Sequence, residues 1–147
     1  MPKNIWRAPR LKRLGAAMLE LALLLPLLLL LTGGIIDFAR CAYFYMAVSD
    51  AAGEGAKFAS FHPVTPTTLG IWNALTRQAA LDSLSGVPGF DINRVTINNP
   101  LVISEGGTSD YKRVRVVVQY AFHTMVSWPM IPESITIRRS VEMRLVR

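Results

Sequence analysis

The chain has 147 residues, of which 51% are hydrophobic, and it carries a formal net charge of +6. The charge excess is local, because the first 13 residues hold five cations and no acid, while the rest holds 11 Lys and Arg against 10 Asp and Glu. Nucleic-acid binding needs a one-sided basic patch, which such an evenly mixed body does not offer. The length allows one modest domain together with a membrane anchor.

Residues 1–15 are predicted to form a basic cytoplasmic leader. They are too short to fold alone and resemble the n-region of a signal peptide. Basic residues directly before an apolar run follow the positive-inside rule, which places this end of the chain in the cytoplasm.

The apolar run after the leader has the length of a membrane span. Residues 21–36 contain no charge, and counted from Ala16 the run is 21 residues long. At about 1.5 Å per residue it spans roughly 31 Å, close to the thickness of a bilayer core. Pro26 is tolerated in such a helix and is expected to bend it. The small residues 32–34 offer an alternative, a signal-peptide cut that would release a secreted domain.

Glu20 is the one acidic residue within this run. A carboxylate near the centre of a membrane helix costs about 2.5–3.5 kcal/mol on insertion scales, and less near an interface. Two interpretations stay open from the residues alone. Glu20 either lies near the cytoplasmic headgroups, or pairs with a cation inside an assembly.

The helix is expected to continue to Phe61, because residues 37–61 contain no proline. Small residues recur along one face at helical spacing and could pack closely against a neighbour; they are Ala42, Ser49, Gly53, Ala56 and Ser60. Gly53 and Gly55 each weaken an isolated helix by about 1 kcal/mol relative to Ala. We therefore expect packing of this segment against a sheet or another subunit, with a locally frayed helix as the alternative.

Charged residues on this helix are spaced for ion pairs. Asp37 and Arg40, and likewise Glu54 and Lys57, lie three residues apart, a spacing worth tenths of a kcal/mol. Cys41 is the single cysteine, so no intramolecular disulfide can form, and an intermolecular bridge is a weaker alternative to a simple apolar role.

A second helix is predicted over residues 69–84, after the prolines that end the first. Thr67 or Thr68 is expected to cap it, and Ser85-Gly86 to close it. Its inward face is predicted from helical spacing and comprises Trp72, Leu75, Ala79 and Leu84. Pro88-Gly89 then predicts a type II turn.

The remainder alternates as strands do. Strands are predicted over 91–98, 101–104, 112–126 and 134–146, with a hairpin-like turn over 105–110 and a loop over 127–132. The clearest strand points one set of side chains inward, namely Val114, Val116, Val118, Tyr120 and Phe122. The prediction is an α+β fold with a three- to four-stranded antiparallel sheet covered on one face by helix. It divides into a leader (1–15), a long helix (16–61) and an extracytoplasmic domain (62–147).

The sequence shows no catalytic pattern. His62 and His123 have no Cys or His at metal-ligand spacing. A Gly-rich phosphate loop and a nucleophile elbow are both absent from the sequence. We therefore predict no enzyme activity, no cofactor or metal, and no small-molecule substrate.

The order of these features resembles the TadE-like family, minor pseudopilins of the bacterial tight-adherence (Flp pilus) system. The family commonly has a glutamate before an apolar run with proline, then an acidic-Phe-Gly-Arg-like turn and an Ala-Ala-Arg-Glu-Gly-Ala-Arg-like segment. LELALLLPLLLLLTGGIIDFAR carries the first two parts here, and AAGEGAKFAS the third, with Gly53 and Lys57 where Arg is usual. The resemblance is strongest over residues 15–61.

The resemblance implies processing and assembly. A prepilin peptidase would cut after Gly15, so that Ala16 becomes the N-terminus and Glu20 the fifth residue. Leu21 departs from the Tyr or Phe that major Flp pilins often have there. The implied partners are the bilayer, the prepilin peptidase, other pilins or pseudopilins and the tight-adherence machinery.

Further expectations follow from the resemblance. The implied location is the inner membrane, single-pass, with the domain in the periplasm and possible incorporation into the pilus. The residues expected to serve helix packing or assembly are Glu20, Pro26, Asp37, Gly53, Glu54 and Gly55. An unprocessed, membrane-anchored periplasmic interaction domain is the alternative.

Overall fold

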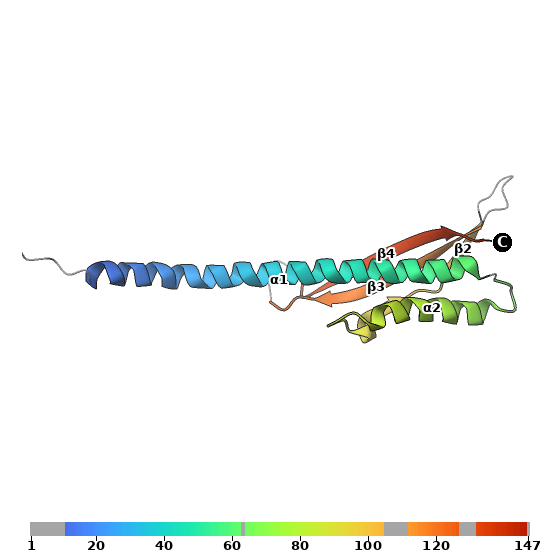
Figure 1. Cartoon of the computed structure of the whole chain (residues 1–147), viewed down its shortest axis with the longest axis horizontal. Helices are drawn as coiled ribbons and strands as arrows, with labels where there is room; N and C mark the ends of the chain where they lie inside the picture. Colours follow the sequence, from blue (N-terminus) through green and yellow to red (C-terminus); the bar gives the residue numbers. More distant parts are fainter. Residues whose placement is uncertain (1–10, 63, 105–111, 127–131, 147) are drawn as a thin grey trace, which may run out of the picture.

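The computed structural model describes residues 11–62, 64–104, 112–126 and 132–146, and shows a long helix with a small α+β domain at its C-terminal half (Figure 1). Helix α1 (Leu11–Phe61) has 51 residues and continues through Pro26. Figure 1 shows α1 as one rod without a visible kink, so the bend expected at Pro26 is not seen. The predicted leader residues 1–10, turn 105–110 and most of the predicted loop 127–132 lie outside the described residues.

The other elements follow in the order that the sequence predicts. They are α2 (Leu69–Ser85), the 3₁₀ turn η1 (Ile92–Arg94), β1 (Val95–Ile97), β2 (Leu101–Ser104), β3 (Lys112–His123) and β4 (Ser134–Arg144). The predicted α+β class is confirmed, with two helices and a four-stranded antiparallel sheet.

Strand β3 is the centre of the sheet and pairs with the other three strands. β4 pairs with it along its whole length, from Arg113 opposite Arg144 to His123 opposite Ser134. β1 and β2 pair with different parts of β3, at residues 118–120 and 112–115. The two short strands therefore share the edge of β3 that β4 leaves open.

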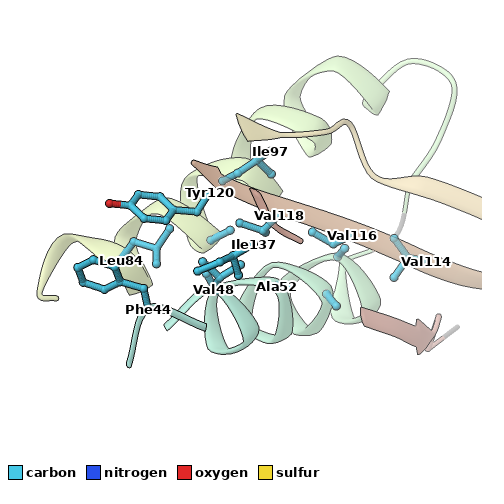
Figure 2. Close-up of a cluster of buried hydrophobic side chains, with 14 of the residues drawn as sticks. Phe44, Val48, Ala52, Leu84, Ile97, Val114, Val116, Val118, Tyr120 and Ile137 are labelled. Atoms are coloured by element: carbon cyan, nitrogen blue, oxygen red, sulfur yellow. The ribbon is translucent and has the colours of Figure 1, made fainter. Parts of the chain in front are cut away.

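The core lies where α1, α2 and the inner face of the sheet meet (Figure 2). All five inward residues predicted for β3 are buried, which confirms the alternation. Phe44 of α1 packs edge-on against three aromatic rings, at centroid distances of 5.4 Å to Phe90, 5.5 Å to Tyr120 and 5.9 Å to Phe122. Edge-to-face pairs stabilise beyond their buried area, so Phe44 joins the helix to the sheet.

Glycine determines how closely α1 approaches its neighbours. A Cβ on Gly55 would lie 3.2 Å from the Cβ of Ala80 and 3.3 Å from Cγ1 of Val116. A Cβ on Gly53 would meet no atom within 4 Å. The predicted close packing is therefore correct for Gly55, which lies between α2 and β3, and Gly53 takes no part in it.

The predicted row of small residues is buried at only two of its five positions. Ala56 and Ser60 are buried, whereas Ala42 is exposed and Ser49 and Gly53 are half-buried. The buried face of α1 instead follows Phe44, Val48, Ala51, Ala52, Ala56 and Ala59. The buried face thus includes the bulky Phe44 and Val48 together with small residues.

Two local expectations were wrong. Residues 92–94 form η1 rather than strand, because the Asp91 carboxylate accepts a hydrogen bond from the Asn93 N–H at 3.0 Å and closes a turn. On α2 the buried residues are Trp72, Thr76, Ala80 and Leu84, so Leu75 faces outward instead of inward. These buried residues are each four positions apart because this face of α2 packs along α1.

The ends of α2 also differ in detail. Thr68 occupies the N-cap position, but its hydroxyl makes no capping hydrogen bond and contacts Thr65 instead. The predicted turn after the helix is confirmed, since Gly89 has a φ of 72° and the Phe90 N–H donates to the Val87 carbonyl at 3.3 Å. That φ suits glycine in a type II turn.

The two helix glycines give a matched pair of variants. We expect Gly55→Leu to lower the free energy of unfolding by about 1–3 kcal/mol, because the side chain overpacks the contact with Ala80 and Val116. Gly53→Ala should raise it by up to about 1 kcal/mol, since Ala is the better helix former in open space. Thermal unfolding in detergent micelles, followed by circular dichroism, measures both. Equal effects of the two changes would contradict the packing assigned to Gly55.

Candidate functional site

The N-terminal half of α1 exposes its apolar side chains, and every residue from Gly15 to Thr32 is exposed. Leucines along residues 19–31 have exposed fractions from 46% to 72%. The most apolar window of the helix has a mean hydropathy of 2.3, and none of it is buried. By length and composition it is the one helix in the described residues that could cross a membrane.

The predicted processing residues lie together at the start of this exposed half. Gly15, Ala16 and Glu20 are all exposed and helical, and a Cβ on Gly15 would meet nothing within 4 Å. Residues 16 and 20 are four apart, so they lie on the same face, one turn from each other. Pro26 is exposed in the same half. The four residues therefore share one accessible stretch of α1.

Asp37 forms the joint between α1 and the sheet. It is only 5% exposed, and its carboxylate accepts hydrogen bonds from the Met125 N–H at 2.9 and 3.1 Å and from the Val126 N–H at 3.2 Å. These two amides follow the end of β3, 88 and 89 residues further along the chain. Buried hydrogen bonds to a charged group contribute more than neutral ones, so the joint is strong.

Arg40 completes this joint. Its guanidinium donates to Asp37 at 3.2 Å, which confirms the predicted ion pair. The same group lies 5.8 Å from the ring centre of Phe44 and 5.5 Å from that of Phe122. Cation–π contacts and the carboxylate together hold the half-buried charge. Phe38, between the two charged residues, faces outward and is 78% exposed.

A second contact lies one turn below the joint. Val126 packs against Gly33, where a Cβ would approach its Cγ2 to 3.2 Å. The sequence predicted Gly33 only as a small residue tolerated in a membrane helix. The close approach depends on the tertiary fold, so no local pattern could reveal it.

The remaining predicted assembly residues lie apart from the joint. Glu54 is exposed and forms the predicted ion pair with Lys57, with an N–O distance of 2.6 Å. Such exposed pairs contribute little to stability. Gly55 is buried and Gly53 is half-buried in the same turn of α1. These residues belong to the domain-facing half of the helix.

Arg139 is a further residue that the sequence analysis missed. It lies opposite Val118 in the sheet, and so falls on the inward face of β4. Its guanidinium lies 4.9 Å from the ring centre of Tyr45 on α1. The alternation of β4 around Ile137 and Val141 contains this signal, because residue 139 shares their face.

Titratable groups elsewhere make local contacts. His62 stacks on Phe58 at 4.0 Å, and His123 lies 3.1 Å from an Arg94 nitrogen. Cys41 is a half-buried free thiol. Within the described ranges, no three His, Cys, Asp or Glu side chains gather as a metal site requires.

The joint can be tested at its carboxylate. We expect Asp37→Ala to leave the Met125 and Val126 amides without their acceptor, which costs about 1–3 kcal/mol for a buried donor. Hydrogen exchange at these two amides should then accelerate by about tenfold or more. Asp50→Ala, an exposed acid on the same helix, is the matched control and should leave both rates unchanged. Unchanged exchange in Asp37→Ala would contradict the assigned role.

Comparison with known protein families identifies a match to part of α1. The TadE-like protein family matches residues 15–57, from the predicted processing glycine to Lys57. No curated protein and no solved structure matches the chain. The match confirms the resemblance that the residues indicated, and covers the exposed half of α1, the Asp37–Arg40 joint and Gly55. The protein thus carries a TadE-like segment on a helix suited to membrane anchoring, and the family indicates a component related to the tight-adherence pilus.

Proposed function

We propose that this protein is a minor pseudopilin, a structural component of a Flp-type pilus or of its assembly base, that a prepilin peptidase cuts after Gly15. The supporting observation is the exposed, apolar N-terminal half of α1, which carries Gly15 and Glu20 at its start and matches the TadE-like family. A helix of this kind can lie in the bilayer and later pack among other helices.

The chemistry of the cut supports the pairing of these residues. Cleavage after Gly15 removes the five leader cations and creates one α-amino cation on Ala16. The Glu20 carboxylate can neutralise that charge on a neighbouring subunit, which reduces the cost of burying both groups and sets the register between subunits. Gly15 also weakens the helix by about 1 kcal/mol relative to Ala, which eases the local unwinding that a peptidase needs.

The orientation follows from charge. The leader cations keep the N-terminus in the cytoplasm, so the α+β domain lies in the periplasm and the helix crosses the inner membrane once. In this arrangement the peptidase meets Gly15 on the cytoplasmic side. Other pilins or pseudopilins meet the helix within the bilayer, and the tight-adherence machinery is the setting in which the component acts.

The processing step has a direct test. In cells that contain a prepilin peptidase, we expect the mature protein to begin at Ala16, and Gly15→Ile to keep the intact leader because a bulky residue blocks the cut. Gly53→Ala is the control and should mature normally. N-terminal sequencing gives the result. Maturation of Gly15→Ile at Ala16 would exclude prepilin processing, an intact leader in the parent would support the unprocessed anchor, and a start near Ile35 would indicate secretion.

The assembly role of Glu20 has a separate test. We expect Glu20→Leu to insert into the membrane at least as well as the parent, since it removes the insertion cost of a carboxylate, which is about 2.5–3.5 kcal/mol at the bilayer centre and less near the interface. Crosslinking to other pilus subunits should nevertheless fall, because the α-amino cation loses its partner. Glu54→Leu, an exposed acid outside the span, should leave crosslinking unchanged. Undiminished crosslinking of Glu20→Leu would show that Glu20 has no assembly role.

A further inference from the structure

The contact between Val126 and Gly33 determines how the domain sits relative to the bilayer. The charge-free run from Leu21 to Ile36 spans roughly 24 Å, which is less than the thickness of a bilayer core, about 30 Å. Counted from Ala16, the run ends near the outer boundary at Ile36. Gly33 therefore lies within the hydrocarbon layer whether the span is counted from Ala16 or from Leu21.

The end of β3 reaches this depth. Val126 packs on Gly33, and Figure 1 shows the C-terminal end of β3 directed toward the exposed half of α1. The amides of Met125 and Val126 are held by Asp37, four residues or about 6 Å above Gly33 along the helix. This separation is comparable to the interfacial layer, roughly 5–8 Å thick on each side of the core.

Met125 is exposed, and so are the apolar side chains of Ile35 and Phe38, which lie at similar depth on other faces of α1. The exposed fraction is 72% for Met125, 78% for Phe38 and 60% for Ile35. If this apolar surface faced water, its exposure would carry an unfavourable free energy proportional to its area. Contact with the upper part of the lipid chains removes that cost.

The backbone at this point is also suited to lipid. Non-helical backbone is excluded from a bilayer unless its polar groups are satisfied within the protein. The N–H groups of Met125 and Val126 both donate to the Asp37 carboxylate. The buried acid one turn above Gly33 therefore satisfies the two donors that would otherwise enter the membrane surface unpaired.

We propose that Met125 and Val126 form a tip that inserts into the outer edge of the hydrocarbon layer, just beneath the headgroups. The tip seats the periplasmic domain on the membrane in one orientation around α1. The inference rests on α1 spanning a membrane and not on a role in a pilus, so it stands or fails independently of processing at Gly15.

The native methionines test the tip without a mutation. The full-length protein is reconstituted in vesicles of phosphatidylethanolamine and phosphatidylglycerol and treated with chloramine-T, a charged oxidant excluded from lipid. Met125 is more exposed in the isolated chain than Met46, at 72% against 57%, and Met46 lies nine residues beyond Asp37 on α1. We expect mass spectrometry to show Met125 oxidised at least about threefold more slowly than Met46, because the hydrocarbon layer at the depth of Gly33 excludes water and the charged oxidant. Oxidation of Met125 at the rate of Met46 or faster would overturn the proposal.

A fluorescent label provides the second measurement. Met125→Cys in a Cys41→Ala background is labelled with an environment-sensitive dye, and Arg77→Cys, on the exposed face of α2 beside the turn that contacts Gly55, is the matched control. Quenching by lipids spin-labelled near the headgroup should reach the label at residue 125 and spare the one at residue 77. Circular dichroism verifies that the labelled variants fold. We expect Met125→Cys to fold because the Met125 side chain is highly exposed.

Contact with a second copy would give a different result. Protection of Met125 would then weaken as the protein is diluted in lipid, and the label at residue 125 would not be quenched by spin-labelled lipid. That outcome would overturn the assignment of the tip to the membrane. Protection that is independent of dilution and accompanied by lipid quenching supports it.

Discussion

One uninterrupted helix must satisfy two different surroundings in this protein. The first half of α1 exposes leucine on all sides, and the second half buries Phe44, Val48 and small residues against a sheet. Because α1 has no break between its two halves, the domain packs along the side of the helix and not beyond its end. The change of surroundings occurs at Asp37, and the structure depends on how this position is arranged.

The joint at Asp37 combines elements that are distant in the sequence. Its carboxylate binds backbone donors after β3, and Arg40 lies between that carboxylate and two aromatic rings. At the other end of the domain, the Val146 N–H donates to the Ser60 carbonyl at 2.9 Å. The sheet is therefore tied to α1 at both ends, 23 residues or roughly 34 Å apart on the helix. These two attachments fix the sheet along the side of the helix.

The TadE-like segment carries several of the residues that make this connection. It spans residues 15–57 and thus includes Gly15 and Glu20, the Asp37–Arg40 joint and Gly55. The sheet and α2 lie outside the match, and they supply the surfaces against which that segment packs. The TadE-like segment of the helix can therefore have two physical roles: its first half suits a membrane or a helix bundle, and its second half positions the domain.

Sequence alone determined the features that depend on local pattern. The apolar run, the cations before it, the alternation of β3 and the Pro88-Gly89 turn each follow from neighbouring residues, because hydrophobic periodicity and backbone restrictions act over a few positions. The pairing of Asp37 with Arg40 was likewise visible from helical spacing. Glu20 stood out because a lone acid in an apolar run has few physical explanations.

Tertiary structure decided which faces are buried and which distant groups meet. Leu75 was expected inside, but α2 buries Thr76, because its contact with α1 selects the face. Arg139 lies half-buried on an inward strand position, where its guanidinium meets the ring of Tyr45 on α1. The bonds from Asp37 to the chain after β3 and the contact of Gly33 with Val126 join residues about 90 positions apart. No local pattern contains such contacts, since they arise only when the sheet folds back along the helix.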